Sequence, residues 1–264
     1  MKRNQSFSEG ASWLVHGSNL YGKIEQDYRG RKKDFLEFAR SKYLPYREAQ
    51  LKITGITKAD IVAKSELYDD YSRSVDVFNQ GNWITAQSKF RPTVLEEFCG
   101  FLFKDLASVK TLGLGFFKKG IYAGLRIDSK GNVEIETRDI DFCISKEVTA
   151  LIGETQYGII IPVVAVECKT YLDKTMLSGA QFTAQKLKGG TPRVKVFVIT
   201  ERNEVDLKEI PSESSIDQIY VVRDGGDKPI ASDVVWDFFS EVKVALERAT
   251  KEQIIKLPGR LLIR

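Results

Sequence analysis

The chain has 264 residues, of which 42% are hydrophobic and 29% are charged, and its net charge is +4. These values exclude a disordered chain and fit one compact domain with a substantial core, or such a domain with a modest N-terminal extension. The small excess of positive charge is compatible with nucleic-acid binding without demanding it, because clustering of Lys and Arg on one face decides that property.

The N-terminus and the cysteines bear on where the protein works. The segment MKRNQSFSEG is positively charged but lacks the apolar stretch of a signal peptide, and no run approaches the ~18 apolar residues of a membrane span. Cys99, Cys143 and Cys168 are odd in number, widely spaced and surrounded by apolar residues, which is typical of reduced core thiols. We therefore expect a cytoplasmic protein that is neither exported nor inserted in a membrane.

The single histidine, His16, restricts the possible chemistry. Metal sites that need two histidines, the HNH nuclease site and the paired-histidine phosphodiesterase site cannot be built from one such residue, and the sequence has no CxxC pair for zinc. Nothing near His16 in the sequence supports a catalytic base at this position. Any active site must therefore rest on other residue types.

The first ninety residues have a helical pattern. The apolar residues between Asp34 and Tyr43 follow helical spacing, and Pro45 is expected to end that helix. A second helix is expected to begin at Thr57, because its spacing to Asp60 matches a capping box.

A domain boundary is expected near residue 90. The sequence has no internal repeat, low-complexity tract or clear linker, and the loop Asn79–Asn82 is the best candidate for a junction. This gives a mostly helical N-terminal extension over residues 1–90 and a core over residues 91–264. The basic segment Arg29–Lys33 within the extension is either a solvated helix start or a cluster that binds phosphates.

A helix is expected to open the core at Arg91. Thr93 and Glu96 have capping-box spacing, so that Glu96 is assigned to the start of the helix. Glu97 lies at the edge of the apolar stripe of this helix, where its carboxylate can reach towards the sheet. Glu97 is a candidate active-site acid, against a surface or ion-paired role, and the choice between Glu96 and Glu97 stays open.

Strands are expected next. They are predicted at Gly113–Leu125, Asn132–Ile144 and Tyr157–Lys169, and the turn Asp128–Asn132 joins the first two as an antiparallel ribbon. The third, YGIIIPVVAVECK, is an apolar run of the kind that is buried on both faces of a sheet.

The remaining elements complete an α/β pattern. A helix capped by Asp173 or Thr175 and stopped by Gly189-Gly190 joins the third strand to Val194–Thr200, so these two strands should be parallel. A further strand is predicted at Gln218–Val222, and a closing helix at Ser232–Ala249 has the apolar stripe of a helix packed on a sheet. The predicted fold class is therefore α/β, with a mixed sheet flanked by helices.

Charged residues stand where the long apolar strand ends. Because side chains alternate along a strand, Glu167 and Lys169 project from the same face. Burying this pair costs several kcal/mol, by order of magnitude, unless the two groups have partners or a metal. Asp141 directly precedes the apolar part of the previous strand and can meet them.

Asp139 is the alternative to Asp141. The two residues share one strand face by their i, i+2 spacing. Asp141 is favoured because Phe142 and Ile144 alternate directly behind it, whereas Asp139 is followed by only one apolar residue.

The trio of Asp141, Glu167 and Lys169 resembles the D…(D/E)XK motif of the PD-(D/E)XK nuclease superfamily, with Glu167-Cys168-Lys169 as its second part. No proline precedes the aspartate, which is a departure at the least dependable position of that motif. The longer stretch ECKTYLDKTML, which ends at Leu177, is similar to the corresponding segment of type II restriction endonucleases of the BbvCI-like group, whose members work as paired subunits. The resemblance covers roughly the middle third of the chain.

This resemblance implies a PD-(D/E)XK restriction-endonuclease-like core and a magnesium-dependent endonuclease that cuts specific DNA sequences. Asp141 and Glu167 would hold Mg2+, with the backbone carbonyl of Cys168 as a third oxygen ligand. Lys169 would orient and help deprotonate the attacking water, or stabilise the developing charge. Related nucleases often take a further acid from a helix before the strands, which is the place of Glu97.

The sequence is also compatible with other functions. The chain can be a repair, recombination or transposition nuclease of the same fold, or a catalytically inert DNA-binding subunit. Asp141, Glu167 and Lys169 can also form a salt-bridge network without catalytic purpose.

The implied partners are double-stranded DNA and a second nuclease subunit. One catalytic trio cuts one strand at a time, so a double-strand break needs two sites, from a homodimer or from a related, non-identical subunit. Basic residues that surround the site in the sequence are candidates for contacts with DNA: Lys118, Lys119, Lys174, Lys186, Lys188, Arg193 and Lys195.

Overall fold

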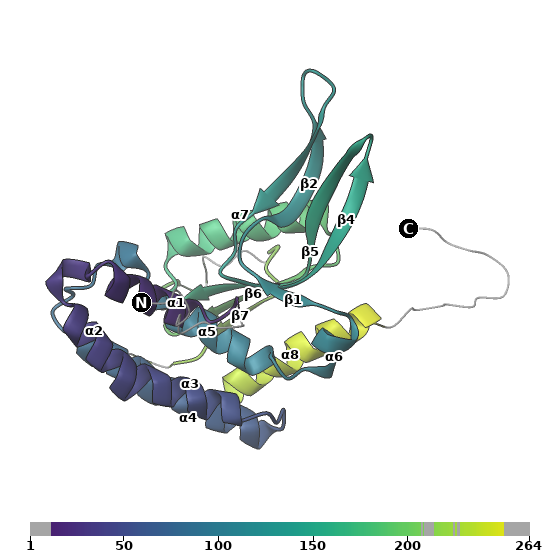
Figure 1. Cartoon of the computed structure of the whole chain (residues 1–264). Coiled ribbons are helices and arrows are strands. Elements are labelled where there is room, and N and C mark those ends of the chain that lie inside the picture. The colour runs from purple at the N-terminus through teal and green to yellow at the C-terminus, as the bar shows by residue number, and fades with distance from the viewer. Residues whose placement is uncertain (1–11, 207, 209–213, 224, 226–227, 251–264) are drawn as a thin grey trace.

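The computed structural model describes residues 12–206, 208, 214–223, 225 and 228–250. The α-helices are α1 (Val15–Glu25), α2 (Lys32–Phe38), α3 (Leu44–Lys52), α4 (Lys58–Phe78), α5 (Pro92–Phe103), α6 (Ala107–Thr111), α7 (Lys174–Gly190) and α8 (Ser232–Thr250). The strands are β1 (Gly115–Phe117), β2 (Ile121–Ile127), β3 (Val133–Arg138), β4 (Phe142–Ile152), β5 (Thr155–Lys169), β6 (Lys195–Thr200) and β7 (Gln218–Val221). Short helical turns lie at Tyr28–Gly30, Ala39–Tyr43 and Ala86–Ser88. Figure 1 shows how the helices and strands are arranged.

One seven-stranded sheet, built around β5, organises the fold. Strand β5 pairs with β4 in antiparallel fashion, with β6 in parallel, and with β2 in parallel through Ile121 and Ile160. Helix α7 connects β5 to β6, and the parallel pairing predicted for this βαβ unit is confirmed. The sheet is mixed, as predicted from the sequence.

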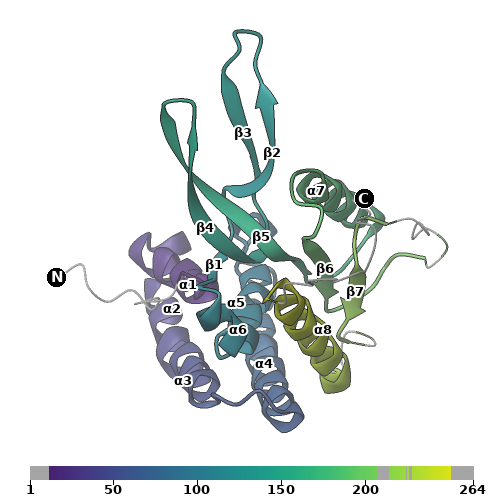
Figure 2. The same ribbon diagram turned by 90° about the vertical axis from the view of Figure 1, so that its right-hand side faces the viewer.

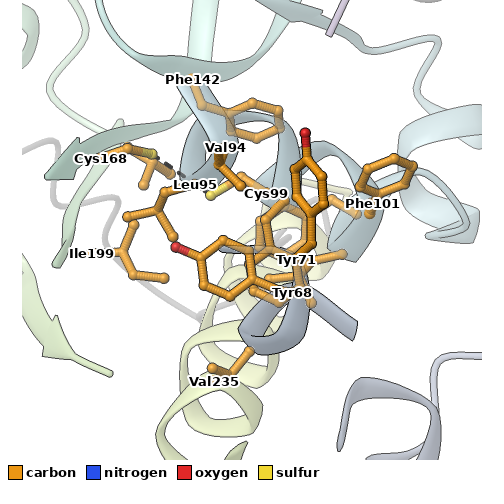
Figure 3. Close-up of a cluster of buried hydrophobic side chains, with 14 of the residues drawn as sticks. Tyr68, Tyr71, Val94, Leu95, Cys99, Phe101, Phe142, Cys168, Ile199 and Val235 are labelled. Atoms are coloured by element: carbon orange, nitrogen blue, oxygen red, sulfur yellow. Dashed lines mark hydrogen bonds between the residues drawn. The ribbon is translucent and has the colours of Figure 1, made fainter. Parts of the chain in front are cut away.

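The two faces of the sheet have separate cores. Val164, Val166 and Cys168 of β5 belong to the larger core, which α1–α6 and α8 build with the sheet. Ala165 belongs to the smaller core, which includes α7. Figure 3 shows the larger core where side chains of α4, α5 and α8 meet those of β4, β5 and β6. This alternation is what the period of two along a strand dictates.

Two hairpins, β2–β3 and β4–β5, project from the body of the molecule (Figures 1 and 2). The predicted burial of the long strand on both faces holds from Val164 to Cys168, but it is wrong for the first residues of β5, which are exposed or half-buried. The reason is that β4 continues to Ile152 and returns through a tight turn, so this part of β5 is a hairpin strand.

Three predicted elements have the wrong bounds. The predicted strand Asn132–Ile144 is two strands, because β3 ends at Arg138 and β4 begins at Phe142. Pro45 does not end the first predicted helix, because a π-helical turn at Ala39–Tyr43 carries the helical chain into α3, whose first turn contains the proline. The predicted strand Gly113–Leu125 is two strands: β1 pairs with β4 whereas β2 pairs with β3 and β5. The chain breaks between them because it crosses to another part of the sheet.

Other local predictions are confirmed. Thr57 and Asp60 form the capping box of α4, and Asp173 caps α7 through the backbone N–H of Met176. The turn at Asp128–Asn132 closes the antiparallel β2–β3 hairpin. The division at residue 90 stays a prediction, and the larger core includes residues from both sides of it. No helix in the described ranges is long and apolar enough to cross a membrane.

Candidate active site

The side chains of Asp141, Glu167 and Lys169 meet where β4 begins and β5 ends. Lys169 Nζ donates to Asp141 Oδ2 at 2.7 Å and to Glu167 Oε2 at 2.6 Å. Asp141 directly precedes β4, and the pairing of Phe142 with Val166 sets it beside the end of β5. The structure thus brings three of the predicted site residues together, while their catalytic roles stay predictions.

Backbone geometry fixes Asp141 in this place. Its Oδ2 also accepts a hydrogen bond from the backbone N–H of Cys168 at 2.9 Å. The thiol of Cys168 points to the other face of the sheet, where its Sγ lies 3.7 Å from Sγ of Cys99. Cys168 can therefore offer only its backbone to the site, and the role of its carbonyl as a metal ligand stays a prediction.

Burial makes the charges of the trio depend on one another. Burial opposes ionisation of Asp141, but the Lys169 ammonium and the Cys168 N–H outweigh it and hold the pKa of this carboxyl below its usual value. Burial and the neighbouring Asp141 carboxylate raise the pKa of Glu167. Burial works against protonation of Lys169, yet the two carboxylates prevail and raise its pKa. The trio carries excess negative charge that a cation would neutralise.

Glu96 brings a further carboxylate to this site. Its side chain is only 3% exposed and pairs with the ammonium of Lys118, which is 33% exposed. Burial and the charge of Asp141 raise the pKa of Glu96, and Lys118 opposes them. Glu96 and Asp141 both line the same two cavities. Glu96 is therefore the acid of α5 that lies with the trio.

Glu97 points elsewhere. Its Oε2 accepts hydrogen bonds from the backbone N–H groups of His16 and Gly17, at 2.9 and 3.0 Å, at the start of α1. The side chain is fully buried, and burial raises its pKa to about 7 although these donors oppose the rise. The structure does not bring Glu97 to the trio, and its contacts favour a role in holding α1.

The predicted capping box at the start of α5 is wrong. The helix begins at Pro92, so Thr93 lies inside its first turn, and its hydroxyl donates to the carbonyl of Phe90. Proline favours the first helical position, and this signal in the sequence places the start one residue before Thr93. Glu96 therefore does not have the capping role that its spacing to Thr93 predicts.

His16 packs inside this helical layer. Its Nε2 lies 2.7 Å from the hydroxyl of Tyr71, and its Nδ1 lies 3.1 Å from the carbonyl of Phe90. Burial lowers its pKa to about 3, so the ring is neutral at pH 7. A hydrogen on Nδ1 satisfies both contacts, so the ring of His16 is hydrogen-bonded within the packed helices.

We expect Glu97→Gln to flatten the dependence of folding stability on pH. An unfolded Glu loses its proton near pH 4.5 but folded Glu97 near pH 7, so in this window only the native state keeps the proton, and stability falls as pH rises. The loss is roughly 3 kcal/mol at about 1.4 kcal/mol per pKa unit. Urea unfolding at pH 5 and pH 8 measures the difference, which should shrink in the variant.

The glutamine keeps an acceptor oxygen for His16 and Gly17, and its amide replaces Oε1, which has no partner among the described residues. Exposed Glu66 on α4 gives the matched control Glu66→Gln. An unchanged pH dependence in Glu97→Gln, with loss of activity at normal stability, would instead support Glu97 as an active-site acid.

Asp139, the alternative to Asp141, is exposed and lies outside the trio. Its Oδ1 accepts from the backbone N–H of Gly120 at 3.2 Å. This contact joins the end of the β2–β3 hairpin to the segment that enters β2. Because Asp141 and not Asp139 contacts Lys169, the geometry favours Asp141 as the first carboxylate of the site.

Two cavities flank the site. One of about 540 Å³ lies between the segment that enters α5 and the segment that follows β5, and its lining includes Lys89, Glu96, Asp141 and Lys169. The other, of about 420 Å³, lies beside β1 and includes Glu96, Lys118, Lys119 and Asp141. Glu96 and Asp141 stand between the cavities, and each cavity carries lysines suited to phosphate groups.

The donor set fits a magnesium ion. Asp141 and Glu167 present hard carboxylate oxygens that converge on one cation, Lys169, and Mg2+ needs only one or two carboxylates besides water and substrate oxygens. Among the described residues, no three His, Cys, Asp or Glu side chains form a ready-made metal cluster. Asp141 and Glu167 are thus the residues that would hold the ion.

Some of the basic residues predicted to contact DNA have partners within the chain. Lys188 and Lys195 both pair with Asp217, at 2.8 and 2.6 Å. The ammonium of Lys186 lies 5.7 Å from the ring centre of Phe182, an aromatic residue that is 52% exposed. Lys118 and Lys119 line a cavity of the site, and DNA contact stays a prediction for the whole group.

Comparison with known proteins points to one class of enzyme. A family model described as Bpu10I restriction endonuclease matches residues 87–253. A solved structure described as the native BbvCI A2B2 tetramer at low resolution matches with a TM-score of 0.70 and 21% identity, over 91% of this chain and 97% of that chain. No curated protein is similar enough in sequence to count as a match. The shared architecture confirms the predicted restriction-endonuclease-like α/β fold.

Proposed function

The chain belongs to the Bpu10I restriction endonuclease family, and we propose that it hydrolyses phosphodiester bonds of double-stranded DNA at a specific sequence, with Mg2+, as a subunit of a paired type II enzyme. The predicted resemblance to BbvCI-like restriction enzymes is confirmed by the family match and the shared fold. The proposal rests on the convergence of Asp141, Glu167 and Lys169 at a point where Asp141 lines both cavities.

The proposed chemistry divides the work among these side chains. Mg2+ held by Asp141 and Glu167 would stabilise charge on the phosphate oxygens and lower the pKa of a bound water. Lys169 donates two of its three ammonium N–H groups to the carboxylates. The third has no acceptor among the described residues, so it can donate to the attacking water or to a phosphate oxygen. The ammonium is therefore held in position before substrate binds, which favours charge stabilisation in the transition state.

The cavities support binding of a DNA backbone on both sides of the scissile bond. Lys118 and Lys119 lie on one side, and Lys89 lies on the other. Ammonium groups that neutralise phosphates supply most of the affinity for DNA that does not depend on sequence. We propose that the strand to be cut runs from one cavity to the other across Asp141.

A second subunit would supply the second cut. The trio acts on one phosphodiester at a time, and the strands of a duplex run in opposite directions, so one chain cannot break both in a single pose. The solved relative is described as an A2B2 tetramer, and we propose that this chain likewise pairs with a related, non-identical subunit. A homodimer on a palindromic site is the alternative arrangement.

Incubation of the purified chain with supercoiled plasmid and Mg2+ tests the function and the pairing together. We expect nicks at one sequence and on one strand, mapped by primer extension. Linear product with matching cuts in both strands would instead support a homodimer. Scattered nicks would point to a repair-type nuclease, and retained DNA binding without any cut, in the presence of the partner subunit, would point to an inert subunit.

We also propose that the protein works in the cytoplasm. The three cysteines are free and buried in the described structure, which suits a reducing compartment.

A further inference from the structure

The segment Lys118–Gly120 runs beside the residues that directly precede β4. It carries the chain from β1, which pairs with β4, to β2, which pairs with β3 and β5. The backbone carbonyl of Lys118 accepts from the N–H of Ile140 at 2.8 Å, and the N–H of Gly120 donates to Asp139. Gly120 has a φ of +67°, a conformation that favours glycine. Lys118 is therefore fixed against the residues that immediately precede Asp141.

The side chain of Lys118 joins Glu96 to the edge of the cavity. Its ammonium pairs with the carboxylate of Glu96, which is almost fully buried, while Lys118 keeps a third of its surface exposed. Removing one partner from such a pair leaves a buried, uncompensated charge. Both residues line the cavity of about 420 Å³ together with Asp141. The ammonium thus lies between a buried acid and the space proposed for DNA.

The charges of the site favour one divalent ion. The carboxylates of Glu96, Asp141 and Glu167 and the ammoniums of Lys118 and Lys169 leave one net negative charge. One Mg2+ changes this to one net positive charge, which matches the single negative charge of a phosphodiester. A second ion bound at Glu96 would have to displace Lys118 or accept repulsion from its ammonium at close range.

We propose that the Lys118 ammonium, paired with Glu96, takes the place of a second divalent ion. It thereby restricts each active site to a single magnesium ion. The proposal deepens the nuclease function proposed above and rests on it. Asp141 and Glu167 would hold the single ion, and the Lys118 ammonium would contribute a further positive charge to the cavity proposed for the phosphate. In the absence of this lysine, Glu96 and Asp141 would offer a second pair of carboxylate oxygens to a divalent ion.

Counting bound Mn2+ tests this directly. Mn2+ accepts the same oxygen ligands as Mg2+, and its paramagnetic resonance signal measures the free ion during a titration of the chain. We expect about one Mn2+ per chain in the unaltered protein, about two in Lys118→Met, and about one in Lys118→Arg, which keeps the charge. The double variant Glu96→Gln with Lys118→Met should return to about one, because the second ligand pair is then lost.

Kinetics provide a second readout. In Lys118→Met, the Mg2+ dependence of cleavage should become cooperative, with a Hill coefficient that rises from about 1 to about 2, and half-maximal activity should need roughly tenfold more Mg2+. Lys110→Met removes an exposed positive charge from α6, outside the lining of both cavities, and should leave the Mn2+ count unchanged.

The outcomes separate the inference from the proposed function. Two Mn2+ per chain in the unaltered protein, together with DNA cleavage, would overturn the role of Lys118 and leave the nuclease intact; this measurement needs no substitution. One Mn2+ in a folded Lys118→Met variant would also overturn it. Absence of both Mn2+ binding and cleavage in the unaltered chain with its partner would overturn the nuclease function and the inference with it.

Discussion

Asp141→Ala and Glu167→Ala should each lower the rate of DNA cleavage by at least about 1,000-fold. Metal-assisted charge stabilisation is worth several kcal/mol, and each ~1.4 kcal/mol is tenfold in rate. DNA binding measured in Ca2+, by contrast, should weaken little or become tighter, because each substitution removes a negative charge from the proposed path of the DNA. Single-turnover cleavage and gel-shift titrations measure the two properties.

Asp139→Asn is the matched control for Asp141. The asparagine keeps an oxygen that can accept from the N–H of Gly120, so the crossing segment stays in place while the negative charge is removed. We expect cleavage close to that of the unaltered chain. A large loss in Asp139→Asn with normal activity in Asp141→Ala would exchange the roles of the two residues. Full activity in the presence of a chelator would contradict the magnesium mechanism altogether.

The sequence predicts which side chains meet at the strand ends, because side chains alternate strictly between the two faces of a strand. The period of two along β5 requires Glu167 and Lys169 to share a face, and a polar residue directly before the apolar stretch of β4 requires Asp141 to lie near them once the strands pair. The structure joins these three through Lys169 Nζ. The sequence predicts that these residues meet because Asp141 directly precedes one strongly apolar run, and Glu167 and Lys169 end another.

Sequence patterns do not show which glutamate of α5, Glu96 or Glu97, lies beside the trio. Glu96 and Glu97 are neighbours on α5, and both are buried, so the apolar stripe of the helix does not distinguish them. Their surroundings do: Lys118 comes from the segment between β1 and β2, whereas the N–H groups that bind Glu97 come from α1. Contacts between residues so far apart in the chain produce no periodic pattern in the sequence. The capping-box spacing of Thr93 and Glu96 predicts a helix cap that the structure does not have.

Strand pairing explains the other differences. The run from Gly113 to Leu125 has continuous strand character, but its halves pair with different strands, and Gly120 provides the turn between them. The hairpin formed by β4 and β5 extends beyond the core, so its outer residues, such as Leu151 at 74% exposure, lack the burial that strand patterns presuppose. Pairing partners and distance from the core are properties of the whole sheet.

Lys169→Met should separate metal binding from catalysis. The methionine keeps most of the length of the side chain but removes the ammonium that lies between Asp141 and Glu167. Without this positive charge the two carboxylates repel each other and attract a divalent ion more strongly. We therefore expect Mn2+ to bind at least as tightly as in the unaltered chain, while cleavage at saturating metal falls by about 100-fold to 10,000-fold.

The opposite signs of these two effects make the test specific to Lys169. A purely structural role would change stability and leave the cleavage rate at saturating metal nearly intact, since bound metal would itself hold Asp141 and Glu167 together. Thermal unfolding in saturating Mn2+ shows whether the variant is folded, and the Mn2+ titration shows whether its carboxylates are intact. A folded Lys169→Met that binds Mn2+ and cleaves at the unaltered rate would assign the lysine to the fold, because charge stabilisation by its ammonium would then contribute nothing to the reaction.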